Sequence, residues 1–167
     1  RIGLVVYAGE SYTRTPVTSD KTIILQSLKT IEYDDSIIAD GTGIGVGLAT
    51  AINRIKDSKA KSRIIILLTD GVNNSGTIDP RTAAEIAKEY GIKVYTIGIG
   101  TNGQAMFPVA KDANGKLVFR KMPVEIDESL MKEIAKATDA KYFRATSNKK
   151  LQAIYDEINK LETTEIQ

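Results

Sequence analysis

Residues 63–76 read Arg63-Ile-Ile-Ile-Leu-Leu-Thr-Asp-Gly-Val-Asn-Asn-Ser-Gly76 and join an apolar run to a carboxylate. A short, unbroken run of large aliphatic residues is typical of a strand buried on both faces inside a parallel sheet. In open α/β sheets, ligands bind beyond the carboxyl ends of such strands, which is where Asp70 falls. Asp-Gly is also common turn chemistry, so a purely turn-forming role for Asp70 is the alternative hypothesis.

Size and composition indicate an ordinary globular protein, expected to form one domain over residues 1–167. The net charge of +2, from 23 basic and 21 acidic residues, does not indicate a nucleic-acid partner. The chain has no cysteine and no histidine, which excludes a disulfide framework, thiol catalysis, a Ser-His-Asp triad and a His-ligated zinc site. No apolar stretch approaches the length needed to cross a bilayer, so a membrane anchor is expected only outside these residues.

Upstream of the apolar run, the pattern predicts two strands and a helix. Residues 2–8 form another apolar run, and residues 12–17 predict a short edge strand because Pro16 cannot donate to a ladder. Residues 18–20 offer an N-cap, and 32–40 predict a polar loop. The helix between them is predicted from apolar residues at helical spacing: Ile24, Leu28 and Ile31.

A glycine-rich stretch opens the next predicted helix. Residues 40–47 read Asp-Gly-Thr-Gly-Ile-Gly-Val-Gly. Each glycine inside a helix costs about 1 kcal/mol relative to alanine, so close approach to a neighbouring strand is the expected reason for them. The basic stretch at 56–63 suits a helix C-terminus and a solvated loop better than a phosphate-binding patch. The apolar face of this helix is predicted to carry Ile44, Leu48, Ala51, Ile52 and Ile55.

Downstream, strands and helices alternate. Asp79-Pro80 predicts a helix start and Gly91 its end, followed by a strand at 92–99. Residues 101–123 predict an excursion that contains a hairpin turn at 112–115. A helix capped by Asp127, a short strand at 141–144 and a closing helix from Ser147 complete the chain. The predicted inward-facing residues of these three helices are, in order, Ala83, Ile86, Ala87 and Tyr90; Leu130, Met131, Ile134 and Ala135; and Leu151, Ile154, Tyr155, Ile158 and Leu161.

This alternation predicts an α/β fold in three layers, with a mostly parallel twisted sheet and helices on both faces. Nucleotide binding is disfavoured. Residues 98–103 match G-x-G-x-x-G after a strand, but the segment that follows is a poor helix start and cannot present its amides to a pyrophosphate. The glycines at 41–47 have the wrong spacing and lack the Gly-Lys-Ser/Thr of a phosphate-binding loop.

The better-supported pair is Thr42 with Asp70, because each lies in a predicted loop after which a helix or turn begins, at the same edge of the sheet. A hydroxyl and a carboxylate are hard oxygen ligands suited to Mg²⁺ or Mn²⁺, with Ca²⁺ as a further candidate. Mg²⁺ keeps several waters, so a coordination position stays open for a carboxylate from outside. The alternative is that Thr42 is a plain N-cap for the helix that follows.

Three stretches together resemble a von Willebrand factor A domain of the BatA type, found in bacterial aerotolerance operons. They are Asp-Gly-Thr-Gly-Ile-Gly at 40–45, Leu-Leu-Thr-Asp-Gly at 67–71 and Val-Tyr-Thr-Ile-Gly-Ile-Gly at 94–100. Residues 3–11, 69–74 and 122–127 strengthen the resemblance, which covers nearly all of the chain. It implies the Rossmann-like fold of that family.

The resemblance also implies a metal-ion-dependent adhesion site built from three loops. The threonine of the second loop corresponds to Thr42 and the aspartate of the third to Asp70, with Gly41, Gly43, Gly71 and Asn73 as a partner-binding rim. The Asp-x-Ser-x-Ser of the first loop has no counterpart, since Ser11 does not fit it. Residues 1–8 resemble the family's second strand, so the chain is expected to lack the first strand and helix. Residues 2–8 and 64–69 would then flank a gap, and the ion would be incompletely held.

The leading hypothesis is a binding module rather than an enzyme, which uses a bound ion to grip an acidic side chain of a protein partner. A metal-independent scaffolding domain is the alternative, and a metal-dependent hydrolase is disfavoured because no general base or second carboxylate cluster is visible. The resemblance implies a bacterial inner-membrane protein with this domain in the periplasm. A MoxR-type AAA+ ATPase and sister Bat proteins are the implied partners.

Overall fold

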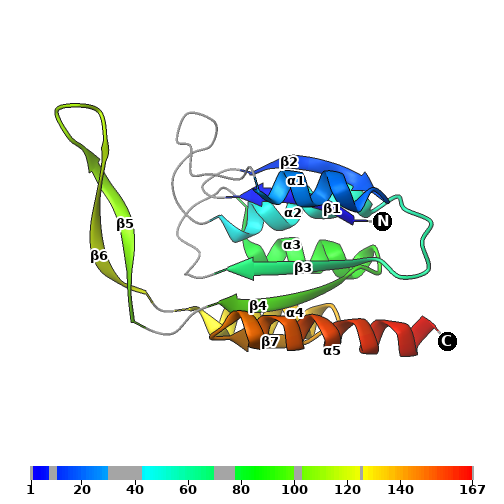
Figure 1. The fold of residues 1–167 in the computed structure, drawn as a ribbon. Coiled ribbons are helices and arrows are strands. Elements are labelled where there is room, and N and C mark those ends of the chain that lie inside the picture. The colour runs from blue at the N-terminus through cyan, green and yellow to red at the C-terminus, as the bar shows by residue number, and fades with distance from the viewer. Residues whose placement is uncertain are drawn as a thin grey trace.

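The computed structural model describes residues 2–7, 11–29, 43–69, 78–99, 103–124 and 126–166 (Figure 1). The predicted polar loop at 32–40 lies outside them. The order of helices and strands confirms the predicted α/β class. In chain order the elements are β1 (Ile2–Tyr7), β2 (Ser11–Thr18), α1 (Lys21–Lys29), α2 (Ile44–Ile55), β3 (Ile64–Thr69), α3 (Pro80–Glu89), β4 (Lys93–Ile99), β5 (Gly103–Lys111), β6 (Leu117–Val124), α4 (Glu128–Ala137), β7 (Tyr142–Ala145) and α5 (Asn148–Ile166).

The centre of the fold is a parallel sheet in the order β3-β4-β7, with helices on both faces (Figure 1). Side chains alternate across strands, so each strand contributes to two cores. One core combines Leu67 and Val94 with apolar residues of α2, α3 and α4. The other combines Tyr95 and Ile97 with apolar residues of α5. These two cores form the predicted three-layer arrangement.

Burial along the sheet differs from the prediction for β3. The sequence predicts β3 as buried on both faces, yet Leu67 and Thr69 are its buried residues and the remaining four are half-buried. The central strand is β4, in which residues 94–98 are all buried. The reason is position, since β4 pairs with β3 on one side and β7 on the other, whereas β3 pairs with β4 alone among the described strands.

Strands β1 and β2 form a separate antiparallel hairpin, and no ladder joins β1 to β3 within the described residues. Strands β1 and β3 run in the same direction (Figure 1). Helix α2 packs against the hairpin and also contacts β3. Ser11, at the start of β2, donates a hydrogen bond to the Val46 carbonyl of α2 at 3.0 Å. Within the described residues, 2–7 and 64–69 therefore do not pair, in agreement with the expected separation.

Local signals for helix starts are confirmed at three places. The Asp20 carboxylate accepts from the Thr22 amide at 2.9 Å, that of Asp79 from the Arg81 amide at 2.8 Å, and that of Asp127 from the Leu130 amide at 3.1 Å. Carboxylates in this position satisfy amides that have no partner inside the helix. The predicted inward residues of α4 are all buried. None of the described helices is both long and apolar enough to cross a membrane.

The predicted buried face of α3 is wrong at two positions. Ile86 and Tyr90 are each 40% exposed, whereas Ala84, which was not predicted, is buried with Ala83 and Ala87. Helix α3 packs against α2 and α4, and an alanine face allows two helices to approach closely. The ring of Tyr90 instead lies 5.9 Å from the Lys56 ammonium at the molecular surface.

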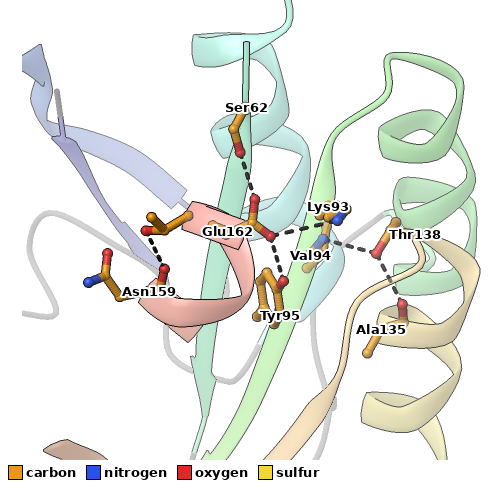
Figure 2. Close-up of polar contacts among 9 residues, drawn as sticks. Ser62, Lys93, Val94, Tyr95, Ala135, Thr138, Asn159 and Glu162 are labelled. Carbon is orange, nitrogen blue, oxygen red and sulfur yellow. Dashed lines mark hydrogen bonds and ion pairs between the residues drawn. The ribbon is translucent and has the colours of Figure 1, made fainter. Parts of the chain in front are cut away.

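A buried polar cluster holds α5 against the amino ends of β3 and β4 (Figure 2). The Glu162 carboxylate accepts hydrogen bonds from the Ser62 hydroxyl at 2.7 Å and the Tyr95 hydroxyl at 2.5 Å. The Lys93 ammonium lies 3.7 Å from the same carboxylate. Burial raises the pKa of Glu162, but these hydrogen bonds and the lysine charge outweigh it, so the pKa lies below its ordinary value.

Candidate functional site

The carboxyl ends of β3, β4 and β7 form one edge of the parallel sheet, at the left of Figure 1. The register aligns Thr69 of β3 with Gly98 of β4, and Gly98 with Arg144 of β7. Parallel strands all end at the same edge, and in open α/β sheets the ligands bind beyond that edge. It is therefore the candidate site.

Most predicted site residues lie outside the described residues: Thr42 and Asp70 of the metal pair, and Gly41, Gly71 and Asn73 of the rim. Gly43 is described and buried, and it holds the N-cap position of α2 without a side-chain hydrogen bond. Thr69, the residue before Asp70, is buried at the end of β3. The structure thus places the chain neighbours of the metal pair, and the metal-site prediction itself stays a prediction.

The N-cap position bears on the alternative role of Thr42. Helix α2 begins at Ile44, with Gly43 as its N-cap, and the Gly43 carbonyl accepts from the Gly47 amide at 3.1 Å. The helix thus starts one residue later than a Thr42 cap requires. Thr42 itself lies outside the described residues, so its capping role stays an alternative prediction.

The two glycines in the first turns of α2 lie in close contacts. A β-carbon on Gly45 would overlap the Ile78 carbonyl, and one on Gly47 would lie 2.6 Å from the Tyr7 ring. The predicted close approach is confirmed, although Gly45 meets the segment that enters α3 rather than a strand. The beginning of α2 is therefore fixed between β1 and the start of α3.

Tyr7 is a residue at this edge that the sequence did not single out. Its hydroxyl donates a hydrogen bond to the Leu68 carbonyl at 2.8 Å, which links β1 to β3 through a side chain instead of a ladder. The contact joins residues 61 positions apart in the chain. A tyrosine at the end of an apolar run was the available signal, but nothing in the sequence identifies its acceptor.

A second polar group lies where β7 meets the start of α4. The Glu128 carboxylate accepts from the Tyr142 hydroxyl at 2.9 Å and from the Arg144 guanidinium at 2.6 Å. The Lys132 ammonium lies 5.8 Å from the centre of the Tyr142 ring. Neither Glu128 nor Arg144 was predicted, because their spacing of 16 residues matches no motif.

These contacts shift the pKa values of their members. The hydrogen bond from Arg144, together with that from Tyr142, lowers the pKa of Glu128. Burial, and then the hydrogen bond to Glu128, raises the pKa of Tyr142 to about 12. The same contact with Glu128 raises the pKa of Arg144. All three groups therefore keep one protonation state near neutral pH, which suits a structural or binding role better than proton transfer.

No cluster of three or more acidic, histidine or cysteine side chains that could hold a metal occurs within the described ranges. The groups that this part of the edge offers are hydroxyls, backbone and the Glu128–Arg144 pair.

Solved structures of similar proteins share this architecture. BatB from Bacteroides thetaiotaomicron is 32% identical, with a TM-score of 0.74, covering 96% of this chain and 78% of that one. An aerotolerance-related membrane protein from Bacteroides fragilis is 30% identical, with a TM-score of 0.72, covering 95% and 78%. Proximal thread matrix protein 1 from the mussel byssus was solved with zinc in its metal-ion-dependent adhesion site (MIDAS) motif. It is 21% identical, with a TM-score of 0.68, covering 96% of this chain and 34% of that one.

The chain spans about half the length of the curated relatives it matches, since it covers 47% of two that are 30% and 31% identical to it. The model of the von Willebrand factor type A domain matches residues 1–157. The fold, these relatives and this match agree with the resemblance in the sequence. The chain belongs to the von Willebrand factor type A domain family.

Proposed function

We propose that this domain is a protein-interaction module that uses a divalent ion at the carboxyl edge of the sheet to bind an acidic side chain of a partner. The observation that carries the proposal is the placement of Gly43 and Thr69. Gly43 is the N-cap of α2 and Thr69 ends β3, and they are the chain neighbours of Thr42 and Asp70. Membership of a family of interaction domains supports the same role.

The chemistry of the proposed pair fits a hard cation. The Thr42 hydroxyl and the Asp70 carboxylate would hold Mg²⁺, or Mn²⁺ or Ca²⁺, directly or through water. An open coordination position would accept the partner's carboxylate, with Gly41, Gly43, Gly71 and Asn73 as the rim. The zinc-occupied MIDAS motif of the mussel protein is consistent with a divalent ion on this fold.

Calorimetric titration of the full-length protein with Mg²⁺ tests the ion. We expect saturable binding that Asp70→Ala abolishes. Asp57→Ala is the matched control, because Asp57 is an exposed carboxylate beyond the other end of α2 and its loss should leave the titration unchanged. Absence of binding, or equal loss in both variants, would rule out the proposed site.

A binding role is favoured over catalysis because a chain without histidine or cysteine cannot form the Ser-His or Cys-His pairs that many hydrolases use. A metal-independent scaffolding role is the second candidate. It is favoured by the β5–β6 hairpin, which extends from the same edge and offers a surface that needs no ion (Figure 1). Partner capture that survives EDTA would support it.

For the cellular setting, we propose an inner-membrane protein that carries this domain in the periplasm and assembles with sister Bat proteins and a MoxR-type AAA+ ATPase. The support is the likeness to BatB and to an aerotolerance-related membrane protein. Co-purification of the full-length protein with the candidate ATPase, with and without Mg²⁺, tests the partnership. A periplasm-specific reporter fused after residue 167 tests the location.

A further inference from the structure

The β5–β6 hairpin is a well-formed element inserted between β4 and α4, as predicted from residues 101–123. Its strands pair antiparallel from Gly103↔Val124 to Lys111↔Leu117. The Asp112 carboxylate accepts from the amides of Asn114 and Lys116, both at 2.9 Å, and closes the turn. Gly115 has a φ of +79°, which completes the turn as the sequence indicated.

The hairpin extends away from the rest of the molecule (Figure 1). Among the described elements, β5 and β6 contact each other and no other helix or strand. A two-stranded hairpin alone is marginally stable in water, and both of its outer edges carry backbone groups able to pair with another strand. An element of this kind gains stability when a third strand or a packing surface is added.

Apolar side chains are exposed on both faces of the hairpin. Val118 is 42% exposed and Phe119 is 47% exposed, and successive residues of a strand point to opposite faces. At these two described positions, then, each face of the hairpin is open to solvent. Charged side chains on an exposed strand commonly prevent aggregation with other chains. This role does not explain why Phe119 and Val118, which are apolar, are exposed beside them.

The hairpin carries an excess of positive charge. Residues 103–124 contain four basic side chains and one acidic one, Asp112, a net charge of +3 that exceeds the +2 of the whole chain. Three of the basic residues, Lys116, Arg120 and Lys121, lie on or beside β6. A complementary surface would therefore be acidic and would lie along β6.

The register identifies which edge is open to pairing. In an antiparallel ladder, pairs whose amides bond across the ladder alternate with pairs whose amides face outward. The pairs Pro108↔Phe119 and Gln104↔Pro123 both belong to one of these two sets. Because proline cannot donate to a ladder, this set must be the one whose amide positions face outward. On β6 the outward amides then include those of Phe119 and Lys121, in a stretch from 117 to 122 without proline.

The arrangement favours a protein strand over a lipid bilayer. The tip carries Lys111, Asp112, Asn114 and Lys116, which lie ahead of the apolar residues along the hairpin. Burying Phe119 in a bilayer would carry these polar side chains and the open edges into hydrocarbon. Strand addition at the flank instead satisfies the outward amides while the tip stays in water.

We propose that the β5–β6 hairpin is a docking arm, and that an extended acidic segment of a protein partner adds to the outer edge of β6 as a third strand. Backbone hydrogen bonds to β6 supply the pairing, Phe119 or Val118 packs against alternate apolar residues of the added strand, and the basic residues pair with its carboxylates. The contact does not depend on the metal site.

The test uses the full-length protein and a fluorescent peptide of alternating glutamate and valine. We expect binding that weakens about tenfold when Lys116 and Arg120, basic residues at positions of the same parity, are both changed to glutamate, or when salt screens the charges. Lys149→Glu with Lys150→Glu is the matched control, because it makes the same charge change at exposed positions of α5 and should leave the affinity within about twofold. Circular dichroism confirms that each variant is folded.

Backbone pairing is tested separately. Phe119→Ala keeps the outward amide and Phe119→Pro removes it, so the second variant should bind the peptide more weakly than the first. A glutamate-valine peptide interrupted by prolines should not bind. Equal binding of that peptide would overturn strand addition, and absence of any binding would overturn the docking arm.

Two further experiments separate the docking arm from membrane binding and from the proposed metal site. Co-sedimentation with vesicles of phosphatidylcholine and phosphatidylglycerol that requires Phe119, without peptide binding, would assign the hairpin to a membrane instead. Peptide binding should survive EDTA and Asp70→Ala. Loss under either condition would place the peptide at the metal face, so failure of the docking arm and failure of the proposed metal site give different results.

Discussion

Two glutamates near opposite ends of the parallel sheet have similar polar partners but different surroundings. Glu162 and Glu128 each accept a hydrogen bond from a tyrosine and lie beside a basic side chain. The Glu162 side chain is 10% exposed, and it joins α5 to Tyr95 and Ser62, which lie 67 and 100 residues away in the chain. The Glu128 side chain is 40% exposed and its partners lie 14 and 16 residues away. Burial and chain separation, rather than the set of groups, should decide how much each cluster contributes to stability.

The largest expected effect is the loss of the buried carboxylate. Glu162→Ala leaves the Tyr95 and Ser62 hydroxyls and the Lys93 charge without their shared acceptor, and should lower the free energy of unfolding by about 3 kcal/mol. Urea denaturation measures it. Glu157→Ala, an exposed glutamate on the same helix, should change it by less than about 0.5 kcal/mol. A loss at position 162 no larger than this control would contradict the comparison.

Acid should remove the same contribution reversibly. Because the pKa of Glu162 in the folded protein lies below its ordinary value of 4.5, its stabilising effect is complete above that value. It is lost as the pH falls through 4.5 and on through the lower pKa of the folded state. The difference in unfolding free energy between the natural chain and Glu162→Gln should therefore shrink over this window. A difference independent of pH would exclude the charged carboxylate as its source.

A smaller effect is expected from the buried tyrosine. Tyr95→Phe removes one of the donors to Glu162 but leaves Ser62 and Lys93, and should cost about 1 kcal/mol. Tyr142→Phe, the corresponding change at the exposed cluster, should cost less, because solvent can replace the lost donor. Thermal unfolding of both variants under one buffer condition provides the measurement. The reverse order would show that exposure does not separate the two clusters.

The smallest effect is expected at Glu128. Its partners are the Arg144 guanidinium and the Tyr142 hydroxyl, and exposed ion pairs contribute little and are screened by salt. Glu128→Ala should destabilise the protein less than Glu162→Ala, and the loss should diminish when salt is raised. Denaturation at low and high sodium chloride tests this, and a loss that ignores salt would point to packing instead of charge.

The contacts that the sequence predicts are local ones. Turns and helix starts depend on residues within a few positions of each other, so Asp79, Asp112 and Asp127 were predicted with their roles. The family resemblance added the fold and the expectation that residues 2–8 and 64–69 do not pair. The structure confirms the fold, and no ladder joins β1 to β3 within the described residues.

Long-range contacts could not be predicted in this way. Glu162 lies on a helix of ordinary periodicity, and nothing local identifies Ser62 or Tyr95 as its partners. The side of α3 that faces the core was misjudged because Ile86 is apolar, whereas contact with two neighbouring helices selects alanines. The proposed roles of Thr42 and Asp70 stay predictions, since both lie outside the described residues.

The hydrogen bond from the Tyr7 side chain to Leu68 has a consequence for how the molecule opens. No ladder within the described residues joins β1 to β3, so the β1–β2 hairpin can separate from the parallel sheet without breaking a sheet hydrogen bond. Helix α2 is the element that contacts both. Native-state hydrogen exchange should therefore resolve two cooperative units, with amides of β1 and β2 exchanging at a lower opening free energy than those of β4. Tyr7→Phe should lower the first value and leave the second nearly unchanged.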